Sequence, residues 1–420
     1  MSNRRVFMKQ TAMALFAAGL GGVPSFIARA ANNKKLWLPY KKNKILICIF
    51  QRGAMDGLMA VSPFTDVNLK QARPTLFMSP AQTEGASIDL DGQFALHPAL
   101  QAFAPYFKEN RLAIVHGVGS PNNTRSHFDA QDYMESGTPF SKSTPSGWLN
   151  RAVGALGHEG TPFRAVSLTS ALPRIFYGDN ETLAINNLQD FAIQMRGNPI
   201  AANKVAQSFE QLYDHTSSSL LNKTGKESFE AIKMLNANAI KTYQPTNGAI
   251  YPVTPLGNAL KQIACLIKMD VGLEVGFAES GGWDTHFNQG TATGQLANNL
   301  RDFSNCINAL WKDLGNNYQD DVTIMTMTEF GRTVKQNGTA GTDHGRASCL
   351  FVLGNDVNGG KVYNNMKSLA KENLEDGRDL PVTTDFRAVF ESVAGNHLQI
   401  KNTKTLFPGW DGNKLSLMKT

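Results

Sequence analysis

Cysteine is scarce in this sequence. The 420 residues contain four cysteines, and they lie far apart in the chain: Cys48, Cys265, Cys306 and Cys349. Disulfide-stapled small domains, zinc ribbons and cluster-binding ferredoxins need cysteines in dense or regularly spaced groups. The scarcity therefore excludes these three classes.

A large excess of charge of one sign is also missing. The net charge is +6, but residues 1–30 hold four basic side chains and no acidic one, which leaves +2 for the rest of the chain. This balance gives no indication of a surface for nucleic acid. No apolar run reaches the roughly 18 residues that a membrane helix needs. We therefore expect no nucleic-acid partner and no stable membrane span.

Several common catalytic signatures are absent as well. The sequence has no G-x-S-x-G, no G-x-x-x-x-G-K-[ST], no H-E-x-x-H and no C-x-P-x-R motif. The last absence argues against a formylglycine sulfatase, and the first three exclude other familiar hydrolase and nucleotide sites. What is present is the composition of a folded protein, with 42% hydrophobic and 18% charged residues.

The first 30 residues are predicted to be a targeting segment. Residues 3–9 (NRRVFMK) resemble a twin-arginine export signal, and a weakly apolar run follows, from Thr11 to Ile27. Residues 28–30 (ARA) then form a cleavage site, and 31–44 read as a linker. An ordinary secretory signal is the alternative. We expect export by the twin-arginine machinery and a periplasmic or secreted mature protein.

Buried strands alternate with helices along most of the remaining chain. Continuous apolar runs predict strands at 45–50, 112–115, 272–277, 322–327 and 350–353. Apolar spacing and capping residues predict helices at 96–107, from 126 onward, and at 255–269, 296–314 and 384–394. This alternation predicts an α/β domain over 45–420, with a mostly parallel sheet and helices on both faces.

The stretch from about 138 to 255 is less regular. Short strands are predicted at 164–168 and 174–177, and two polar helices at 201–243. We interpret the stretch as an inserted cap or side layer.

Acidic residues and histidines follow the predicted strands, in glycine-rich turns. Ligands of open α/β sheets bind at the carboxyl ends of the strands. Carboxylates and imidazoles there suit one or two divalent ions, namely zinc, manganese, magnesium or calcium. The candidate ligands are Asp56, Asp284, His286, Glu329, Asp343 and His344.

Ser126 is the candidate nucleophile because it opens a predicted helix, where free amides stabilise a developing anion. Each candidate also has an ordinary structural interpretation. Asp56-Gly57 alone is typical of a turn, Ser126 alone of an N-cap, and residues 284–286 of a polar surface loop.

These same residues resemble an exported family known as domain of unknown function 1501. The motifs are RGAMDG at 52–57, TRSHF at 124–128, GWDTH at 282–286, EFGR at 329–332, GTDHG at 341–345 and LFPG at 406–409. The family is grouped with the alkaline phosphatase and sulfatase-like superfamily. The resemblance implies an alkaline phosphatase-like core and metal-dependent hydrolysis of phosphate or sulfate esters.

The resemblance also implies roles for single residues. Asp56 corresponds to the first-strand metal aspartate, Ser126 to the nucleophile with Thr124 as alternative, and Asp284 with His286 to a metal-binding pair. Asp343 and His344 correspond either to the Asp-His pair that follows a core strand, or Glu329 takes that place and His344 corresponds to the last histidine of the other site, which is the preferred placement. Arg125 and Arg332 stand in the motifs as candidates for binding the anionic ester, and Cys349 replaces a further histidine that many relatives carry.

We therefore expect an exported metal-dependent ester hydrolase that uses a serine nucleophile and acts on a small-molecule or polymer ester. The alternative is an exported binding or assembly protein that keeps a hydrolase-like fold with an incomplete metal site.

Overall fold

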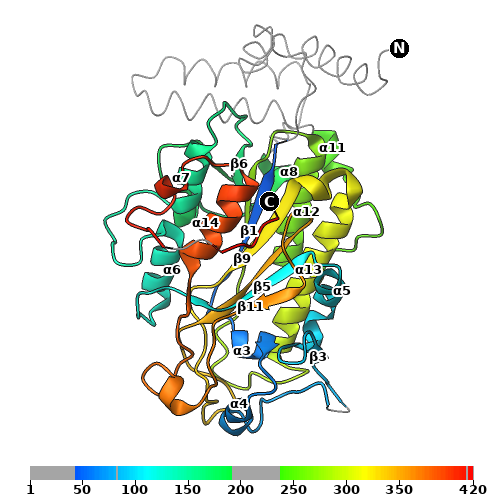
Figure 1. The fold of residues 1–420 in the computed structure, drawn as a ribbon. Coiled ribbons are helices and arrows are strands. Elements are labelled where there is room, and N and C mark those ends of the chain that lie inside the picture. Colours follow the sequence, from blue (N-terminus) through cyan, green and yellow to red (C-terminus); the bar gives the residue numbers. More distant parts are fainter. Residues whose placement is uncertain (1–42, 82–83, 192–236, 413–414, 420) are drawn as a thin grey trace, which may run out of the picture. The chain divides into compact units, whose positions relative to one another are not determined.

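The computed structural model of the chain describes residues 43–81, 84–191, 237–412 and 415–419 (Figure 1). The predicted signal segment 1–30, all but the last two residues of the linker and most of the predicted helical stretch 201–243 lie outside the described residues. No described helix is both long enough and apolar enough to cross a membrane.

A mixed, mostly parallel sheet of nine strands organises the described chain. Eight strands follow one another in the order β11 (Lys361–Tyr363), β5 (Leu112–Gly119), β10 (Ser348–Gly354), β9 (Val322–Met327), β1 (Ile45–Gln51), β8 (Val275–Ser280), β6 (Ala165–Ser167) and β7 (Leu183–Ala184). The ninth, β12 (Thr384–Asp385), pairs with β5. Only the two pairings of β10 are antiparallel, so the predicted sheet type is confirmed.

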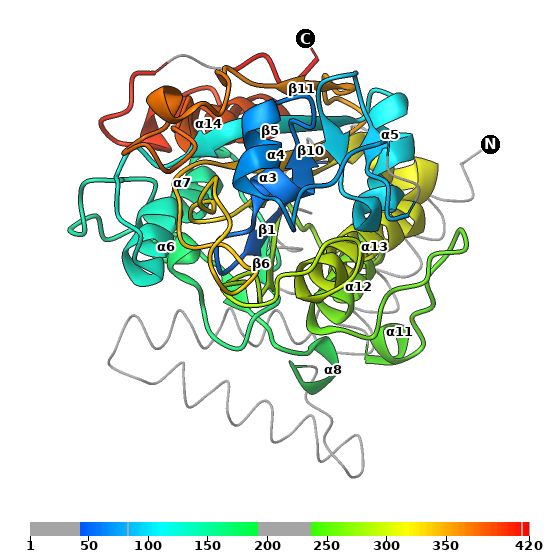
Figure 2. The same cartoon turned by 90° about the horizontal axis from the view of Figure 1, so that it is seen from below.

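Helices cover both faces of this sheet, as Figures 1 and 2 show. In β1, Leu46, Cys48 and Phe50 belong to a core cluster with residues of α7 (Trp148–Ala155) and α14 (Phe386–His397). The other face of the sheet is covered by α12 (Pro255–Met269) and α13 (Gln295–Tyr318). There a Cβ atom on Gly276 of β8 would lie 3.6 Å from Ile47 and 3.5 Å from Ile263 of α12. Burial on both faces explains why the strand is a continuous apolar run.

The two long helices follow their sequence signals closely. Thr254 caps α12 by accepting from the Gly257 N–H, Pro255 occupies the first turn, and Asp270 ends the helix in a left-handed conformation with a φ of 57°. In α13 the predicted stripe from Leu296 to Leu314 is buried. Capping thus marks the start of α12, and apolar spacing identifies α13.

The remaining elements are short. They are the helices α3 (Gly57–Ala60), α4 (Val67–Ala72), α5 (Ala104–Lys108), α6 (His127–Ser136), α8 (Leu188–Phe191) and α11 (Ala237–Lys241), the 3-10 turns η1 (Pro98–Phe103), η2 (Arg174–Phe176), η3 (Gln319–Asp321), η4 (Lys371–Asn373) and η5 (Thr403–Thr405), and a small antiparallel sheet of β2 (Val61–Ser62), β4 (Ala95–Leu96) and β3 (Ile88–Asp89).

One expectation for the stretch 138–255 needs correction. Residues 174–176, in a predicted strand, form the 3-10 turn η2 instead, because the Ile175 N–H donates to the Glu135 carboxylate and not to a neighbouring strand. The first part of the stretch contacts the main sheet and its core. There α7 belongs to the main core, and β6 pairs with β8 in the main sheet.

The strand directions bring five loops to one edge of the sheet. β1, β8 and β9 run parallel to one another. β10 runs antiparallel to both β5 and β9, so it starts where β1, β5, β8 and β9 end. The loops that carry the candidate site residues therefore meet at this edge.

Candidate functional site

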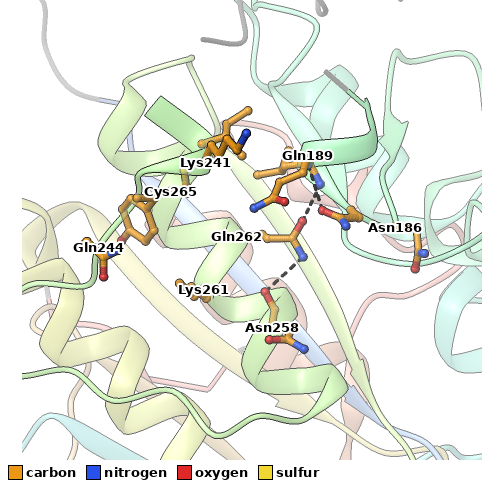
Figure 3. Close-up of a pocket in the computed structure, with 12 residues that line it drawn as sticks. Asn186, Gln189, Lys241, Gln244, Asn258, Lys261, Gln262 and Cys265 are labelled. Carbon is orange, nitrogen blue, oxygen red and sulfur yellow. Dashed lines mark hydrogen bonds between the residues drawn. The ribbon is translucent and has the colours of Figure 1, made fainter. Parts of the chain in front are cut away.

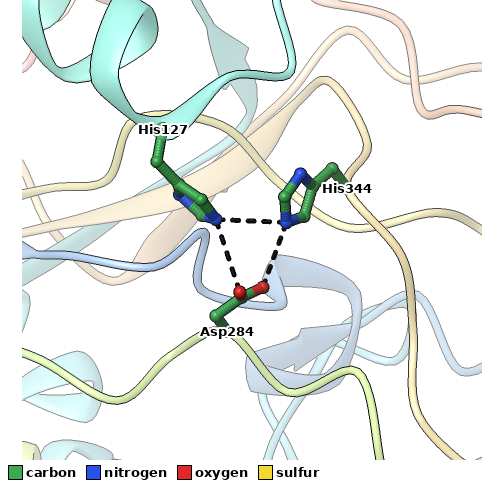
Figure 4. A group of neighbouring side chains, drawn as sticks. All are labelled: His127, Asp284 and His344. Atoms are coloured by element: carbon green, nitrogen blue, oxygen red, sulfur yellow. Dashed lines mark hydrogen bonds and ion pairs between the residues drawn. The ribbon is translucent and has the colours of Figure 1, made fainter.

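Three histidines and one aspartate converge at this edge. The ligand atoms of His127, Asp284 and His344 all lie within 4.8 Å of one another (Figure 4). The His127 and His344 Nε2 atoms are 3.1 Å apart, and Asp284 lies 3.1 Å from His344 Nε2 and 3.5 Å from His127 Nε2. His286 Nε2 joins them at 2.9 Å from both His344 Nε2 and Asp284 Oδ1. We call these four residues the His/Asp cluster.

The other nitrogen of each histidine ring faces an acceptor. The Nδ1 contacts are His127 to Glu329 Oε1 at 2.8 Å, His286 to Asp343 Oδ1 at 3.1 Å and His344 to the Arg125 backbone oxygen at 2.9 Å. Carboxylates and carbonyls only accept, so each Nδ1 carries the proton. In the neutral rings, three Nε2 lone pairs and one carboxylate therefore face one another.

This donor set fits a divalent cation. Zinc binds imidazole nitrogen and carboxylate oxygen at about 2.0–2.2 Å, so two donors of one ion lie no more than about 4.4 Å apart. The ligand atoms of His127, Asp284 and His344 meet this condition, with separations of 3.1–3.5 Å. Histidine ligands of metal sites typically donate their second nitrogen to a carboxylate or carbonyl, as all three histidines do here. His127, Asp284 and His344 would hold the ion, and His286 lies beside the last two.

The surroundings shift the pKa values of the cluster histidines in opposite directions. The hydrogen bond that His127 donates to Glu329 raises the pKa of His127, whereas burial together with the nearby His127 lowers the pKa of His344. Burial opposes ionisation of Asp284, but Arg332 outweighs it and holds the pKa of this carboxyl below its usual value. Site carboxylates that stay ionised beside neutral imidazoles are what a divalent ion requires.

Glu329 and Asp343 do not belong to the cluster, but each contacts one of its histidines. Glu329 is fully buried, and its Oε1 accepts from His127, Gln131 and the Gly53 N–H at 2.8–2.9 Å. Burial would raise its pKa, yet the hydrogen bonds from His127 and Gln131 hold it below the usual value. Both carboxylates therefore orient histidines, and neither faces the other ligand atoms directly.

Close backbone packing sets the loops in place. Gly53 has a φ of 118°, and a Cβ atom there would lie 2.8 Å from the Asp284 backbone nitrogen. A Cβ atom on Gly341 would lie 2.3 Å from the His286 carbonyl oxygen. Both positions require glycine because the ligand loops touch there.

Asp56 does not join the cluster. It is fully buried, and its two oxygens accept from Arg73 at 2.8 and 3.1 Å and from Gln289 at 2.8 Å. It also caps α3 through the Met59 N–H. A carboxylate engaged with a buried guanidinium has little capacity left for a metal, so the structure supports a structural role for this residue.

Ser126 caps α6, directly before His127. Its hydroxyl accepts from the Asp129 N–H at 3.5 Å, which is a long contact, and its own N–H donates to the Thr124 hydroxyl at 3.2 Å. The hydroxyl thus lies at the start of a ten-residue helix whose first residue belongs to the cluster.

The two candidate anion-binding arginines are both engaged with carboxylates. Arg332 has a fully buried side chain and donates to Asp284 at 2.6 Å. Arg125 donates from Nε to the Asp379 carboxylate at 3.0 Å and from Nη2 to the Asp376 carboxylate at 3.2 Å. Arg332 therefore positions a cluster residue, whereas Arg125 contributes its backbone oxygen to the His344 ring.

His127 is the cluster residue that the ligand prediction missed. It stands beside the predicted nucleophile in the TRSHF motif, after a predicted strand, as the other ligands do. That position was the available signal. In the sequence, a histidine at the first position of a helix is interpreted as part of the helix cap. Only the fold shows that its ring faces the other ligand loops.

Fold and cluster together define an α/β protein with a candidate metal centre at the strand ends. The chain belongs to the family of proteins of unknown function DUF1501, whose model matches residues 43–406. This confirms the family predicted from the motifs. No curated protein matches the chain.

Solved structures that match the fold include members of the alkaline phosphatase superfamily. An alkaline phosphatase from the Antarctic bacterium TAB5 matches with a TM-score of 0.32 and 10% identity, over 77% of this chain and 96% of that chain. A protein in the alkaline phosphatase superfamily from Vibrio parahaemolyticus matches with a TM-score of 0.32 and 9% identity, over 78% of this chain and 63% of that chain. The structure of Ps i-CgsB in complex with k-i-k-neocarrahexaose matches with a TM-score of 0.39 and 10% identity, over 89% of this chain and 75% of that chain.

Proposed function

We propose that this protein is a metal-dependent hydrolase of phosphate or sulfate esters. The observation that carries the proposal is the convergence of the His127 and His344 Nε2 atoms with the Asp284 carboxylate, next to His286, each histidine being held through its Nδ1 by an acceptor. A divalent ion bound there would supply Lewis-acid chemistry, which stabilises negative charge on the oxygens of an ester.

The protein residues have separate tasks in this proposal. Glu329, Asp343 and the Arg125 carbonyl hold the histidine rings, and Arg332 holds Asp284. In the proposed reaction the Ser126 oxygen attacks the phosphorus or sulfur atom, the bond to the ester's alcohol breaks, and the alcohol leaves with the serine proton. Water then hydrolyses the serine ester and releases phosphate or sulfate. Ser126 stands at a helix N-terminus, where backbone amides and the helix dipole favour negative charge. The Asp284 and His286 side chains are each 43% exposed, so a substrate can reach the cluster from their side.

The paired arginines make substrate binding depend on the metal. Arg125 and Arg332 already neutralise carboxylates, so neither offers an unpaired positive charge to an anionic ester. We therefore expect anion affinity to vanish when the metal is removed.

Metal titration and turnover together test the proposal. Purified protein should bind about one zinc or other divalent ion per chain and hydrolyse an aryl phosphate or sulfate, and a chelator should abolish both properties. Asp284→Asn and His344→Ala should lose metal and activity together. Metal-loaded protein that turns over no ester in a broad panel would favour the alternative, an exported binding or assembly protein.

We also propose that residues 1–30 direct twin-arginine export to the periplasm or beyond. The paired guanidinium groups of Arg4 and Arg5 are read as an address, and lysine does not reproduce their planar geometry. The double variant Arg4→Lys, Arg5→Lys should therefore remain in the cytoplasm. Its arrival in the periplasm would indicate an ordinary secretory signal.

A further inference from the structure

The arginine of the RGAMDG motif is connected to the His/Asp cluster through a glutamine. Arg52 Nη1 donates to Gln131 Oε1 at 2.9 Å. Gln131 Nε2 in turn donates to Glu329 Oε1 at 2.9 Å, and the same oxygen accepts from His127 Nδ1 at 2.8 Å. These four residues form one continuous line of hydrogen bonds, which we call the Arg52 chain.

The Gln131 amide has one orientation that satisfies both of its neighbours. A guanidinium group only donates hydrogen bonds, and an ionised carboxylate only accepts them. The amide oxygen must therefore face Arg52 and the amide nitrogen must face Glu329, which is the orientation present. A reversed amide would place N–H groups against Arg52 and an oxygen lone pair against Glu329. Arg52 thus determines that Gln131 presents a donor to the carboxylate.

Several elements hold the Arg52 guanidinium in place. Arg52 directly follows β1, and its guanidinium donates to Glu135 of α6 at 2.9 Å and to Glu279 of β8. The guanidinium carbon also lies 4.3 Å from the centroid of the Phe50 ring. Two carboxylates and an aromatic ring therefore position Arg52 independently of Gln131.

Helix α6 brings the other groups to the same place. His127, Gln131 and Glu135 are spaced four residues apart, so their side chains follow one another along one face of the helix. From this face His127 and Gln131 contact Glu329, and Glu135 contacts Arg52. The helix that supplies a cluster histidine therefore also supplies the support for that histidine.

We infer that Arg52 and Gln131 are positioning residues of the proposed metal centre. Arg52 orients the Gln131 amide. The amide in turn holds the Glu329 carboxylate, which receives the His127 Nδ1 proton. The inference rests on the proposed function, and it gives a role to the first residue of the RGAMDG motif. Loss of one hydrogen bond of this chain should change the zinc Kd by about 2- to 12-fold.

Zinc competition with a chelator, measured on the full chain, tests the inference without requiring turnover. Gln131→Met keeps the length of the side chain but removes both amide contacts, so the zinc Kd should rise by about 2- to 12-fold. Melting curves should show that the variant folds. An unchanged Kd would overturn the inference.

Gln262→Met is the matched control. Gln262 is also a partly buried helix residue with an amide engaged at both ends: Oε1 accepts from the Leu188 N–H at 2.7 Å, and Nε2 donates to the Asn258 backbone oxygen at 3.2 Å. It lines a pocket formed by residues of α8, α11 and α12 (Figure 3), and its partners do not belong to the Arg52 chain. The control should keep the wild-type zinc Kd. An equal rise in both variants would overturn the inference, because the effect would then reflect general stability.

Double variants distinguish action along the Arg52 chain from independent stabilisation. If Gln131 acts through the Glu329 carboxylate, Gln131→Met should raise the Kd no further in a Glu329→Gln background. Arg52→Lys keeps a positive charge beside Glu135 and Glu279, but one ammonium nitrogen does not reproduce the contacts of two guanidinium nitrogens. The carboxylates attract this ammonium more strongly than the neutral amide does. Arg52→Lys should therefore raise the Kd of the wild type and add nothing to Gln131→Met.

Additive effects in either pair would overturn the inference, because each residue would then stabilise the protein separately. An unchanged Kd in Arg52→Lys would also overturn it. Zinc binding by the wild type is measured first. A chain that binds no zinc refutes the proposed function and the inference with it, whereas a zinc-binding chain with additive effects refutes the inference alone.

Discussion

At the scale of single residues, the Glu329 charge determines how His127 presents its ring. Glu329→Gln removes the negative charge that receives the Nδ1 proton at 2.8 Å. Loss of such a supporting carboxylate typically costs about 10- to 100-fold in metal affinity. We expect the zinc Kd, measured by competition with a chelator, to rise by that factor.

Glu274 offers a matched control for this change. It is also buried and also faces a histidine, since His158 Nε2 lies 3.1 Å from its Oε1, but it precedes β8 at the opposite end of the strand. Glu274→Gln should leave the zinc Kd unchanged. Equal effects of the two substitutions would mean that Glu329 acts through general stability and not through His127.

Asp56 should contribute to stability and not to metal binding. Asp56→Asn leaves the Arg73 guanidinium, with its side chain 1% exposed, without its carboxylate. Breaking a buried ion pair in this way costs about 3–5 kcal/mol of unfolding free energy. Urea unfolding should show this loss, while the zinc stoichiometry of the folded protein stays the same. Lost zinc at unchanged stability would return Asp56 to the metal site.

The sequence motifs predicted which polar residues lie at the site better than they predicted the role of each residue. Asp284, His286 and His344 reach the His/Asp cluster, and Glu329 and Asp343 lie next to it. In the sequence Asp56 also looks like a metal ligand, because the motif does not show that Arg73, 17 positions later, binds its carboxylate oxygens. Ligand and ion-pair partners are distinguished only by long-range packing.

At the scale of elements, Ser126 at the start of α6 has two roles, as the helix N-cap and as the proposed nucleophile. Ser126→Ala removes the N-cap and should cost about 1 kcal/mol of stability. If Ser126 is the nucleophile, the substitution should also abolish ester turnover while zinc remains bound, since binding does not replace the lost step. A turnover assay, a zinc measurement and a melting curve on the same sample separate these effects.

Thr254→Ala is the control for the cap. Thr254 caps α12 by accepting from the Gly257 N–H at 3.2 Å, so its loss should lower stability similarly without affecting turnover. Full activity of Ser126→Ala combined with inactivity of Thr124→Ala would move the nucleophile two residues upstream. Full activity of both variants would exclude a hydroxyl nucleophile from this loop.

Elements with strong local signals were predicted well. The apolar runs of β1 and β9, the capped helix α12 and the periodic helix α13 lie where the sequence places them. Strand direction is different, because a buried run looks the same in a parallel or an antiparallel pair. The reversed direction of β10 brings His344, which precedes that strand, to the edge where the other strands end.

At the scale of the whole molecule, three buried histidines make stability depend on pH. His97, His116 and His397 are 1%, 0% and 3% exposed, and burial lowers the pKa of each to about 4. In each ring Nε2 lies against a backbone carbonyl, and Nδ1 lies against a donor N–H or hydroxyl. Protonation of Nδ1 would replace this second contact with a repulsion in His97 and His116, whereas the Thr323 hydroxyl beside His397 can turn to accept and leaves burial as the cause.

The sign of the effect follows from the folded and unfolded pKa values. Unfolded histidine has a pKa of about 6.5, so below this pH the unfolded chain binds more protons than the folded chain. Stability is therefore complete above pH 6.5 and falls as the pH approaches 4. Between pH 7 and pH 5 the loss is on the order of 2 kcal/mol for each histidine.

His397→Gln tests this dependence in one ring. The variant lacks the titrating group, so its urea unfolding free energy should fall less between pH 7 and pH 5 than that of the wild type, by about 2 kcal/mol. Both proteins are measured in chelator, so that proton competition at the His/Asp cluster does not contribute. An identical decline in the two proteins would mean that His397 is already protonated in the fold, or that acid unfolding depends on the carboxylates instead.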